Sequence, residues 1–421
     1  MLSPWGREDG SGVKAMLARW LAVPLWQRIL GALVLGALAG WLAGPQVEAV
    51  RWLGDLFIRM IRMLIVPLVF TTLVAGIVSM EAPGRLASIG VKALSLYLMT
   101  TLAAVSIGIL LAVLLEPGRG VDLSGATAVA LAAPVPMAAR MMAIVPENVL
   151  AAFADGDVLA VIFFAVLFGV GLMQAGAAGQ PLAGMMTAAA QVMLKVTGMV
   201  MEFAPLGVFA LVAHVMGTEG PGAFGNMLLL AMVVYLGGAL HMLLSHAGLV
   251  RLLGRLGPLA FFKAVRAPQL MAYSTSSSAA TLPVTLEAAR TGLGVSGPVA
   301  SAVLPLGATV NMDGTALYVA AVAVFSAQIF GIPLSAETYA MIALTTVLVS
   351  VGTASVPSAS LFLMAAVLEV IGMSPAQTAL VIGFVLPFDR VLDMWRTLVN
   401  VTGDLAVARA VEQWEGQGGR T

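Results

Sequence analysis

The segment F-V-L-P-F-D-R-V-L-D-M-W-R-T-L-V-N-V-T-G-D, residues 384–404, carries a row of polar side chains within an apolar stretch. The row advances in steps of 4, 3, 4 and 4 residues through Asp389, Asp393, Arg396, Asn400 and Asp404. On a helix with about 100° per residue, these positions fall within roughly 80° of arc. One helix is therefore predicted to present three carboxylates, a guanidinium and a carboxamide along a single face, with a threonine at its edge.

The composition places this row in a membrane. Of the 421 residues, 60% are hydrophobic and 10% are charged, whereas soluble domains contain about 25% charged residues. The runs 158–194 and 224–250 contain no Asp, Glu, Lys or Arg, and about 20 apolar residues suffice to cross a bilayer. Each charged group at membrane depth costs on the order of 2.5–3.5 kcal/mol. We therefore expect the row to line a cavity or a path, or to form ion pairs.

The same composition excludes other classes of function. A formal net charge of zero gives no reason to expect a nucleic-acid partner, and the absence of cysteine excludes disulfides and thiolate metal sites. Neither a P-loop nor an H-E-x-x-H motif occurs. The three histidines, His214, His241 and His246, lack metal-ligand spacing with one another and are interpreted as packing or interfacial residues.

The first half of the chain predicts ordinary helices. They cover residues 26–44, 51–79, 88–115, 144–176, 188–216 and 224–250. Basic residues in segment 1–22 and in loop 81–92 favour the cytoplasmic side by the positive-inside rule. We expect a cytoplasmic leader rather than a cleaved signal peptide, and a multi-pass protein of the plasma membrane, the inner membrane of a bacterium.

The second half resembles a repeated unit. The first copy, from about residue 256, has an apolar arm, a polar tip at 275–283, a returning arm and a span interrupted at 311–315. The second copy, from about residue 336, has an arm, a tip at 350–360, a returning arm and then the polar helix. Arms of about 15 residues are too short to cross a bilayer. They predict two re-entrant helical hairpins, and such paired interruptions point to a transporter site.

The predicted breaks suit two kinds of ligand. At the first tip, the free N–H groups of the second arm and the hydroxyls of Ser277 and Ser278 favour a carboxylate. At the break in the following span, carbonyl groups beside Asn311 and Asp313 offer oxygen ligands for a hard cation of the sodium type. Asn400 and Asp404 can add further oxygens. The breaks therefore predict a site for both an anionic group and a cation.

The polar row completes the predicted substrate. The planar guanidinium of Arg396 matches a carboxylate in a bidentate way. Asp393, three residues earlier, suits an ammonium group. A ligand with two carboxylates and one ammonium group would use the whole set.

Three motifs carry a resemblance to a known family. S-S-S-A-A-T-L-P-V-T at 276–285, N-M-D-G-T-A-L-Y at 311–318 and D-M-W-R-T-L-V-N-V-T-G-D at 393–404 resemble the dicarboxylate/amino acid:cation symporters, in the same order. That family includes the excitatory amino-acid transporters and the archaeal aspartate transporters. The resemblance covers nearly everything from the second helix onward. It implies an all-α polytopic fold of eight transmembrane helices and two re-entrant hairpins in inverted repeats, assembled as a homotrimer.

The resemblance also implies a static scaffold and a mobile transport domain that moves like an elevator. Helices 1 and 2 with the leader (1–80) and helix 5 (187–216) belong to the scaffold. In 81–186, helix 3 goes with the transport domain and helix 4 with the scaffold. Helix 6 (217–254) joins the transport domain, whose core at 255–421 holds hairpin 1, helix 7, hairpin 2 and helix 8.

Site residues follow from the resemblance position by position. Substrate would contact Ser277, Ser278, Thr315, Val356, Asp393, Arg396, Thr397 and Asn400. One sodium ion would bind Asp404 with backbone oxygens of Gly307, Asn311 and Asn400. A second would bind backbone oxygens near Thr309, Met312, Ser350, Val351 and Thr353. A third would bind Asp313 and Asn311 with Tyr97, Thr100 and Thr101.

The chain departs from the family pattern in places. Relatives that carry acidic substrates have a further arginine where this chain has Ser276 or Met394, and Arg390 is the candidate to replace it. Ser358 and Ser360 stand in the second tip where glycines or an amide are usual. Substrate preference and gate closure are the properties that these departures affect.

Structural interpretations compete with the functional ones. Asp389, Asp393 and Arg396 can form an ion-pair ladder that holds helices together, and for Asp389 both interpretations stay open. The serine run at the first tip can be a polar loop, N-M-D-G-T can be a turn, and the hydroxyls of helix 3 can serve helix packing. The paired motifs favour the functional interpretations.

The sequence thus predicts a secondary-active, sodium-coupled importer of glutamate or aspartate, with no organic cofactor and no enzymatic activity. A proton- or sodium-coupled C4-dicarboxylate carrier of the same fold has no need of Asp393, and neutral amino-acid carriers of the family generally lack the arginine at 396. An ion channel would conduct without substrate. A membrane-embedded hydrolase needs a base beside a serine, and no histidine lies near either tip in sequence.

Overall fold

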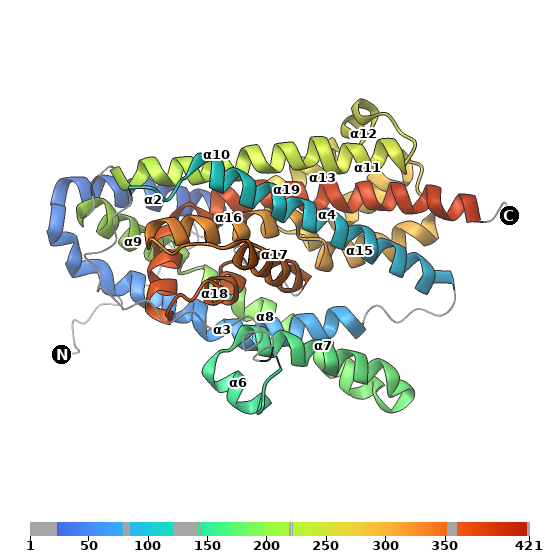
Figure 1. Ribbon diagram of the computed structural model, residues 1–421, viewed down its shortest axis with the longest axis horizontal. Coiled ribbons are helices and arrows are strands. Elements are labelled where there is room, and N and C mark those ends of the chain that lie inside the picture. Colours follow the sequence, from blue (N-terminus) through green and yellow to red (C-terminus); the bar gives the residue numbers. More distant parts are fainter. Residues whose placement is uncertain are drawn as a thin grey trace, which may run out of the picture.

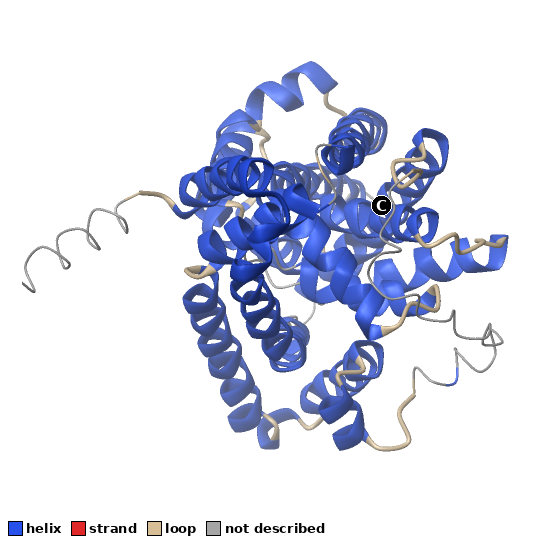
Figure 2. Cartoon of the chain, turned by 90° about the vertical axis from the view of Figure 1, so that its left-hand side faces the viewer, coloured by secondary structure: helices blue, strands red, loops and turns tan. Residues whose placement is uncertain are grey.

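The computed structural model describes residues 23–78, 85–120, 142, 145–218, 220, 222–351 and 360–418. Across these residues, the regular secondary structure is helical (Figure 2). Five helical segments are long and apolar enough to cross a membrane: Gln27–Val78, Ser88–Leu115, Gln180–Met201, Gly225–Leu252 and Gly297–Ile329. The structure therefore confirms an all-helical fold with several long apolar helices.

The first half of the chain forms the ordinary helices that the apolar runs predict. They are α2 (Leu25–Ala43), η1 (Gly44–Val50), α3 (Arg51–Val78), α4 (Arg85–Leu115), α6 (Val149–Asp155), α7 (Val158–Gln174), η2 (Gly176–Ala178), α8 (Gln180–Met201), α9 (Ala204–Thr218), α10 (Gly222–His241), η3 (Met242–His246) and α11 (Ala247–Leu252). The predicted fourth helix is divided at Gly156, which has a positive φ of 77°, and Asp157 caps α7 by accepting from the Ala160 N–H at 3.0 Å. The predicted fifth helix begins earlier, at Gln180, and is divided at 202–203.

The second half is built from shorter pieces, as its interruptions predict. They are α12 (Pro258–Ala264), α13 (Arg266–Thr275), α14 (Ser278–Glu287), η4 (Ala288–Gly292), α15 (Gly297–Val310), α16 (Asp313–Ile329), α17 (Ala336–Val351), α18 (Ser360–Val370) and α19 (Pro375–Gly418). The pairs α13–α14 and α17–α18 each pack against one another. The polar row lies on α19, which continues without interruption over 44 residues.

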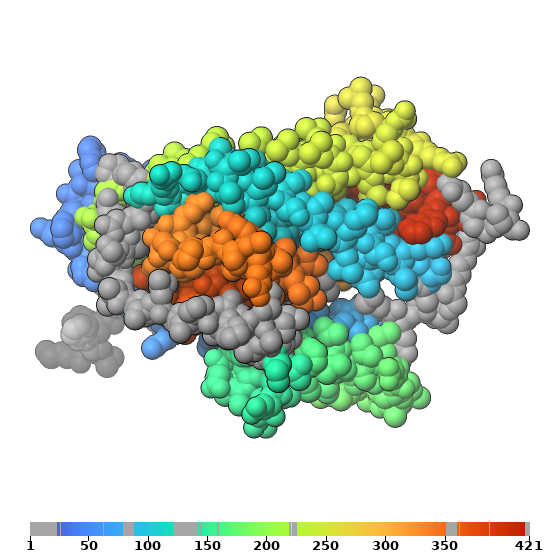
Figure 3. Space-filling view, viewed as in Figure 1, coloured from blue at the N-terminus to red at the C-terminus, as the bar shows by residue number. Residues whose placement is uncertain are grey.

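Two groups of helices pack around different partners (Figure 1). In one group, α2 packs on α9, and α3 packs on α7, α8 and α9. In the other, α19 packs on α13, α15 and α16, while α4 and α10 pack on α16. Figure 3 shows the green segment around α6 and α7 projecting from one side of the molecule. Helix α16 is the centre of the second group, because every residue from Asp313 to Ala327 is buried.

Candidate functional site

The break between α15 and α16 brings these helices against α19. Helix α15 ends at Val310, Asn311 has extended backbone angles, and α16 begins at Asp313. The N–H of Gly314 donates to Asn400 Oδ1 at 2.7 Å. A Cβ atom on Gly314 would lie 2.6 Å from the carbonyl oxygen of Arg396, so this approach requires glycine. The predicted interruption of the span is confirmed, and it faces the polar row.

Asn311 connects the break to the far end of the polar row. Its Nδ2 donates to Asp404 Oδ1 at 2.9 Å and to the carbonyl oxygen of Asn400 at 3.1 Å. Its Oδ1 is buried and has no hydrogen-bond partner within the described part of the chain. Gly307 faces the same place, because a Cβ on it would lie 2.5 Å from Asp404 Oδ1 and would meet the Tyr97 hydroxyl. Two of the residues predicted for the first sodium site, Asn311 and Gly307, therefore lie beside the Asp404 carboxylate.

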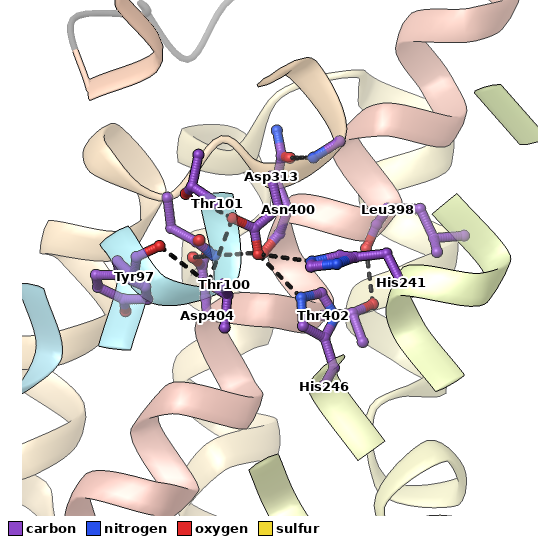
Figure 4. A network of polar contacts seen from close by, with 12 residues as sticks. Tyr97, Thr100, Thr101, His241, His246, Asp313, Leu398, Asn400, Thr402 and Asp404 are labelled. Atoms are coloured by element: carbon purple, nitrogen blue, oxygen red, sulfur yellow. Dashed lines mark hydrogen bonds and ion pairs between the residues drawn. The ribbon is translucent and has the colours of Figure 1, made fainter. Parts of the chain in front are cut away.

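Asp313 lies at the centre of a second set of polar contacts (Figure 4). Its Oδ1 accepts a hydrogen bond from Thr101 Oγ1 at 2.7 Å and a weaker one from Thr100 Oγ1 at 3.4 Å. Its Oδ2 lies 3.1 Å from His241 Nε2 and 3.0 Å from His246 Nε2. We call the buried set formed by Asp313, Asp404, Asn311, Thr100, Thr101, His241 and His246 the Asp313 cluster.

Two members of the Asp313 cluster were not expected from the sequence. His241 and His246 are fully buried, and their Nε2 atoms and a carboxylate oxygen of Asp313 lie within 4.8 Å of one another, an arrangement that could hold a metal ion. Their spacing of five residues does not place two side chains together on an α-helix. They converge because residues 242–246 form the π-helical turn η3. The pattern of apolar residues does not indicate this π-helical turn.

The hydroxyl of Tyr97 bonds to the backbone of a neighbouring helix, not to the Asp313 carboxylate. Its OH donates to the carbonyl oxygen of Val303 at 3.1 Å, which ties α4 to α15. Its own carbonyl oxygen accepts from Thr100 Oγ1 at 3.0 Å. The predicted grouping of Thr100 and Thr101 with Asp313 is thus found in the structure, whereas the Tyr97 hydroxyl donates to the backbone of α15.

The middle of the polar row forms a set of ion pairs. Arg396 is fully buried, and its Nη1 donates to Asp389 Oδ1 at 2.9 Å while its Nη2 donates to Asp393 Oδ1 at 2.8 Å. Its guanidinium carbon lies 4.1 Å from the centre of the Tyr318 ring, a cation–π contact. We call Asp389, Asp393, Arg396 and Tyr318 the Arg396 cluster. The ion pair with Arg396 supports a structural role for Asp389.

Arg390 approaches the Arg396 cluster from the edge. Its Nη1 lies 3.8 Å from Asp393 Oδ2, which is long for a hydrogen bond. Arg390 is 6% exposed and Ser360 is 2% exposed. Ser360 Oγ donates weakly to Asp389 Oδ1 at 3.4 Å. Arg390 and Ser360 therefore both lie beside aspartates of the polar row.

Asn400 lies between the two clusters. Besides the Gly314 N–H, it contacts Met312 Sδ at 3.2 Å through Nδ2, and Thr315 Oγ1 at 3.5 Å. Thr397 Oγ1 donates to the carbonyl oxygen of Asp393 within α19 at 2.8 Å. The structure therefore gathers the predicted residues of the break and of the polar row into one buried region.

The first tip has the predicted helix start. Ser276 has a positive φ of 51° and ends α13, and Ser277 Oγ accepts from the N–H of Ala280 at 3.2 Å, which caps α14. Ser278 is buried. Gln269 Nε2 donates to Thr402 Oγ1 at 3.0 Å, which joins α13 to α19 below the polar row.

Only part of the second tip can be compared with the prediction. Ser350 is buried. Thr309, which lies on α15 and was predicted for the same sodium site as the second tip, donates from Oγ1 to the Leu306 carbonyl oxygen at 2.9 Å. The backbone of Val351 ends α17. Thr353, Val356 and Ser358 lie outside the described residues.

The fold and site together define a polytopic transporter. Short broken helices meet at buried charged residues, which is the arrangement of secondary-transporter sites. The chain belongs to the Sodium:dicarboxylate symporter family, whose profile matches residues 25–414. It is therefore a membrane transporter of a symporter family and not an enzyme.

Curated relatives cover nearly the whole chain. It is 32% identical over 404 residues to the "Proton/sodium-glutamate symport protein" of Bacillus caldotenax, across 93% of this chain and 94% of the relative. It is 34% identical over 410 residues to the "Proton/glutamate-aspartate symporter" of Escherichia coli (strain K12), across 93% and 92%. It is 33% identical over 404 residues to the "C4-dicarboxylate transport protein" of Rhodopseudomonas palustris (strain BisB18), across 93% and 88%.

Proposed function

We propose that the protein is a sodium-coupled symporter that imports glutamate or aspartate. The observation that carries this proposal is the contrast in charge between the two clusters. In the Arg396 cluster, Asp389 and Asp393 both pair with the Arg396 guanidinium, and a second arginine, Arg390, lies 3.8 Å from Asp393. In the Asp313 cluster, neither Asp313 nor Asp404 has a lysine or arginine partner among the described residues. A buried charge without a partner costs free energy. A bound mobile cation would offset this cost in the Asp313 cluster.

The ligand atoms available in the Asp313 cluster favour a hard alkali cation. Carboxylate, amide and hydroxyl oxygens come from Asp313, Asn311, Thr100 and Thr101. Asp404 adds a second carboxylate, held by the amide of Asn311. Oxygen-rich sets of this kind suit sodium rather than softer metals. We assign one sodium ion to Asp404 with backbone oxygens of Gly307, Asn311 and Asn400, one to Asp313 with its neighbours, and one to the backbone near Thr309, Met312 and the second tip.

The Arg396 cluster suits a zwitterionic substrate by exchange of ion pairs. Both terminal nitrogens of Arg396 are held by Asp389 and Asp393. A substrate side-chain carboxylate that replaces Asp393 at Nη2 frees the Asp393 carboxylate for the substrate ammonium group. Asp389 keeps its ion pair, so the buried guanidinium stays balanced during the exchange. Ser277, Ser278, Thr315, Thr397, Asn400 and Val356 complete the proposed contacts.

The two packing groups support the proposed division into scaffold and transport domain. Helices α2, α3, α7, α8 and α9 pack mainly on one another, whereas α4, α10 and the elements from α13 onward pack around the two clusters. We assign the first group to a scaffold that forms a homotrimer and the second to a transport domain that moves like an elevator. The plasma membrane of a bacterium is the proposed location.

A C4-dicarboxylate carrier is the second candidate function. It is favoured by the relative from Rhodopseudomonas palustris, whose identity to this chain matches that of the glutamate carriers. Such a substrate has two carboxylates but no ammonium group, so Asp393 would gain no new partner when it leaves Arg396. The ion pair between Asp393 and Arg396 therefore argues for the amino acid.

Uptake into proteoliposomes tests the proposal and separates the candidates. Labelled glutamate, aspartate, succinate and a neutral amino acid are compared under a sodium gradient, a proton gradient and no gradient. The proposal expects accumulation of glutamate or aspartate that requires the sodium gradient. Accumulation of succinate alone would support the dicarboxylate carrier. Accumulation driven only by the proton gradient would show that the coupling ion is a proton instead of sodium. Sodium current that is independent of substrate would support a channel.

A further inference from the structure

The two buried histidines of the Asp313 cluster share one carboxylate oxygen. His241 Nε2 and His246 Nε2 lie 3.1 and 3.0 Å from Asp313 Oδ2, and their rings pack edge to face with centres 4.4 Å apart. The other carboxylate oxygen, Oδ1, faces the hydroxyls of Thr100 and Thr101. The contacts therefore divide the carboxylate into an imidazole side and a hydroxyl side.

The backbone is shaped to bring both imidazoles to this oxygen. Five residues of an α-helix turn the chain by about 500°, which leaves the two side chains roughly 140° apart. In η3, the N–H of Ala247 instead bonds to the carbonyl oxygen of Met242, five residues earlier. This wider turn places His241 and His246 on one side. Single π-helical turns within α-helices occur frequently at functional sites.

The hydrogen-bond network assigns the imidazoles as donors. The Nδ1 atoms of His241 and His246 are buried and have no hydrogen-bond partner in the described chain. A proton placed on Nδ1 would lack an acceptor, so the tautomer with a proton on Nε2 satisfies the network. A transition metal at this place would need the Nε2 lone pairs and would leave two buried Nδ1–H groups unpaired. The 3.0–3.1 Å separations are those of hydrogen bonds.

Two donors on Oδ2 fix the rotation of the carboxylate. Because Oδ2 is held by both imidazoles, Oδ1 is directed at Thr101 and Thr100 on α4. The buried Oδ1 of Asn311, which has no partner among the described residues, belongs to the same cluster. Outer hydrogen bonds of this kind commonly orient a ligand for a metal ion, and their loss typically costs about 10–100-fold in affinity.

We infer that His241 and His246 are positioning residues for a sodium site formed by Asp313, Asn311, Thr100 and Thr101. The inference rests on the proposed function, because it takes the coupling ion to be sodium. It gives the histidines no contact with the ion. Their Nε2–H groups hold Asp313 so that one oxygen faces the cation.

Substitution by glutamine or asparagine tests the positioning role, because the two amide side chains differ in length. The Nε2 of glutamine takes nearly the place of histidine Nε2, whereas the amide of asparagine ends near the place of Nδ1. The sodium concentration for half-saturation of labelled-glutamate binding is measured on the purified full chain with His241→Gln, His241→Asn, His246→Gln and His246→Asn. We expect the Asn variants to need about tenfold or more sodium, and the Gln variants to stay within about threefold of the parent.

The matched control is His214→Asn, since His214 contacts the partly exposed Glu48 away from the cluster. We expect it to leave the sodium requirement unchanged. Thermal unfolding of each purified variant verifies folding, and a variant that does not fold is replaced by the substitution at the other histidine. Glutamate affinity at saturating sodium is expected to change little in the Asn variants.

Two results would overturn the inference. Asn variants with the parental sodium requirement would show that the histidines do not position Asp313, and Gln variants as impaired as the Asn variants would show that ring packing matters instead of the donor. A parent protein whose glutamate binding ignores sodium would overturn the proposed function itself, and the inference with it. Parental binding thus distinguishes the two failures.

Discussion

The two clusters along α19 are both buried, yet they satisfy their carboxylates in opposite ways. In the Arg396 cluster, Asp389 and Asp393 share one guanidinium at 2.9 and 2.8 Å. In the Asp313 cluster, Asp313 and Asp404 accept from hydroxyl, amide and imidazole groups. In the proposed function, the first cluster exchanges one ion-pair partner for a zwitterion, whereas the second, which has no arginine or lysine partner among the described residues, binds a cation. One helix would then serve two ligands.

Asn400 lies on α19 between Arg396 and Asp404. Its carbonyl oxygen accepts from Asn311, its Oδ1 accepts from the Gly314 N–H, and its Nδ2 approaches Thr315. A cation bound by Asp404 and Asn311 would therefore contact the backbone of Asn400, whose side chain belongs to the proposed substrate site. Coupling requires both ligands to act on a shared element, and Asn400 is the residue that the proposed substrate contacts and a proposed sodium site have in common.

The largest effect is expected from Arg396→Ala. The substitution leaves Asp389 and Asp393 buried without their guanidinium, and removal of one partner of a buried ion pair costs about 3–5 kcal/mol. Uptake of glutamate into proteoliposomes should fall by about 100-fold or more, with a lower unfolding temperature. Arg290→Ala, at an exposed position, serves as the control. Undiminished glutamate uptake would remove Arg396 from the substrate site.

The next largest effect is expected from Asp404→Asn. It removes one negative charge from the Asp313 cluster and leaves the Arg396 cluster intact. The sodium concentration for half-saturation of glutamate binding should rise about tenfold, equivalent to about 1.4 kcal/mol. Asp155→Asn, on an exposed side chain, should leave it unchanged. The assignment of Asp404 to sodium fails where the variant keeps the parental sodium dependence.

A smaller effect is expected from Gly403→Ala. The added Cβ would lie 2.6 Å from Asn311 Nδ2, 3.0 Å from His246 Nε2 and 3.2 Å from Asp313 Oδ2. Crowding of this kind costs about 1–3 kcal/mol, so unfolding temperature should fall and the sodium requirement should rise. Gly416→Ala on the same helix, with no atom within 4 Å of the added Cβ, is the matched control. Equal behaviour of the two variants would contradict the close packing of the Asp313 cluster.

The smallest effect is expected from Trp395→Phe. The indole ring stacks on the Tyr235 ring with centres 5.0 Å apart, and its Nε1 donates to the carbonyl oxygen of Val234 at 3.3 Å. Phenylalanine keeps the stacking and loses the hydrogen bond, which costs about 0.5–1.5 kcal/mol of stability. Thermal unfolding should register this loss while glutamate uptake stays at the parental level. A changed sodium or substrate requirement would place Trp395 in the site.

The sequence predicted the features that depend on short-range pattern. The stripe of α19 follows from steps of three and four residues, and the break at 311–312 follows from Asn, Asp and Gly within an apolar span. Apolar runs located the long helices, but the predicted bounds extended across internal breaks at Gly156 and at 202–203. Polar residues mark both breaks in the sequence, Asp155 and Asp157 at the first and Glu202 at the second.

Tertiary contacts were harder to foresee. The convergence of His241 and His246 on Asp313 depends on one extra residue in the turn η3, and spacing alone places these side chains on different faces. The ion pair between Asp389 and Arg396 spans seven residues. The spacing of the polar row allows this pair, but it does not distinguish a structural role for Asp389 from a substrate-binding role. The side-chain role of Tyr97 depends on the neighbouring helix α15.

Simultaneous measurement of sodium and glutamate flux into the same proteoliposomes tests the central claim most directly. We expect labelled sodium to enter together with glutamate, neither to accumulate without the other, and Asp404→Asn to weaken both fluxes. Glutamate accumulation of equal extent in the presence and absence of sodium would contradict the assignment of the Asp313 cluster to a coupled cation.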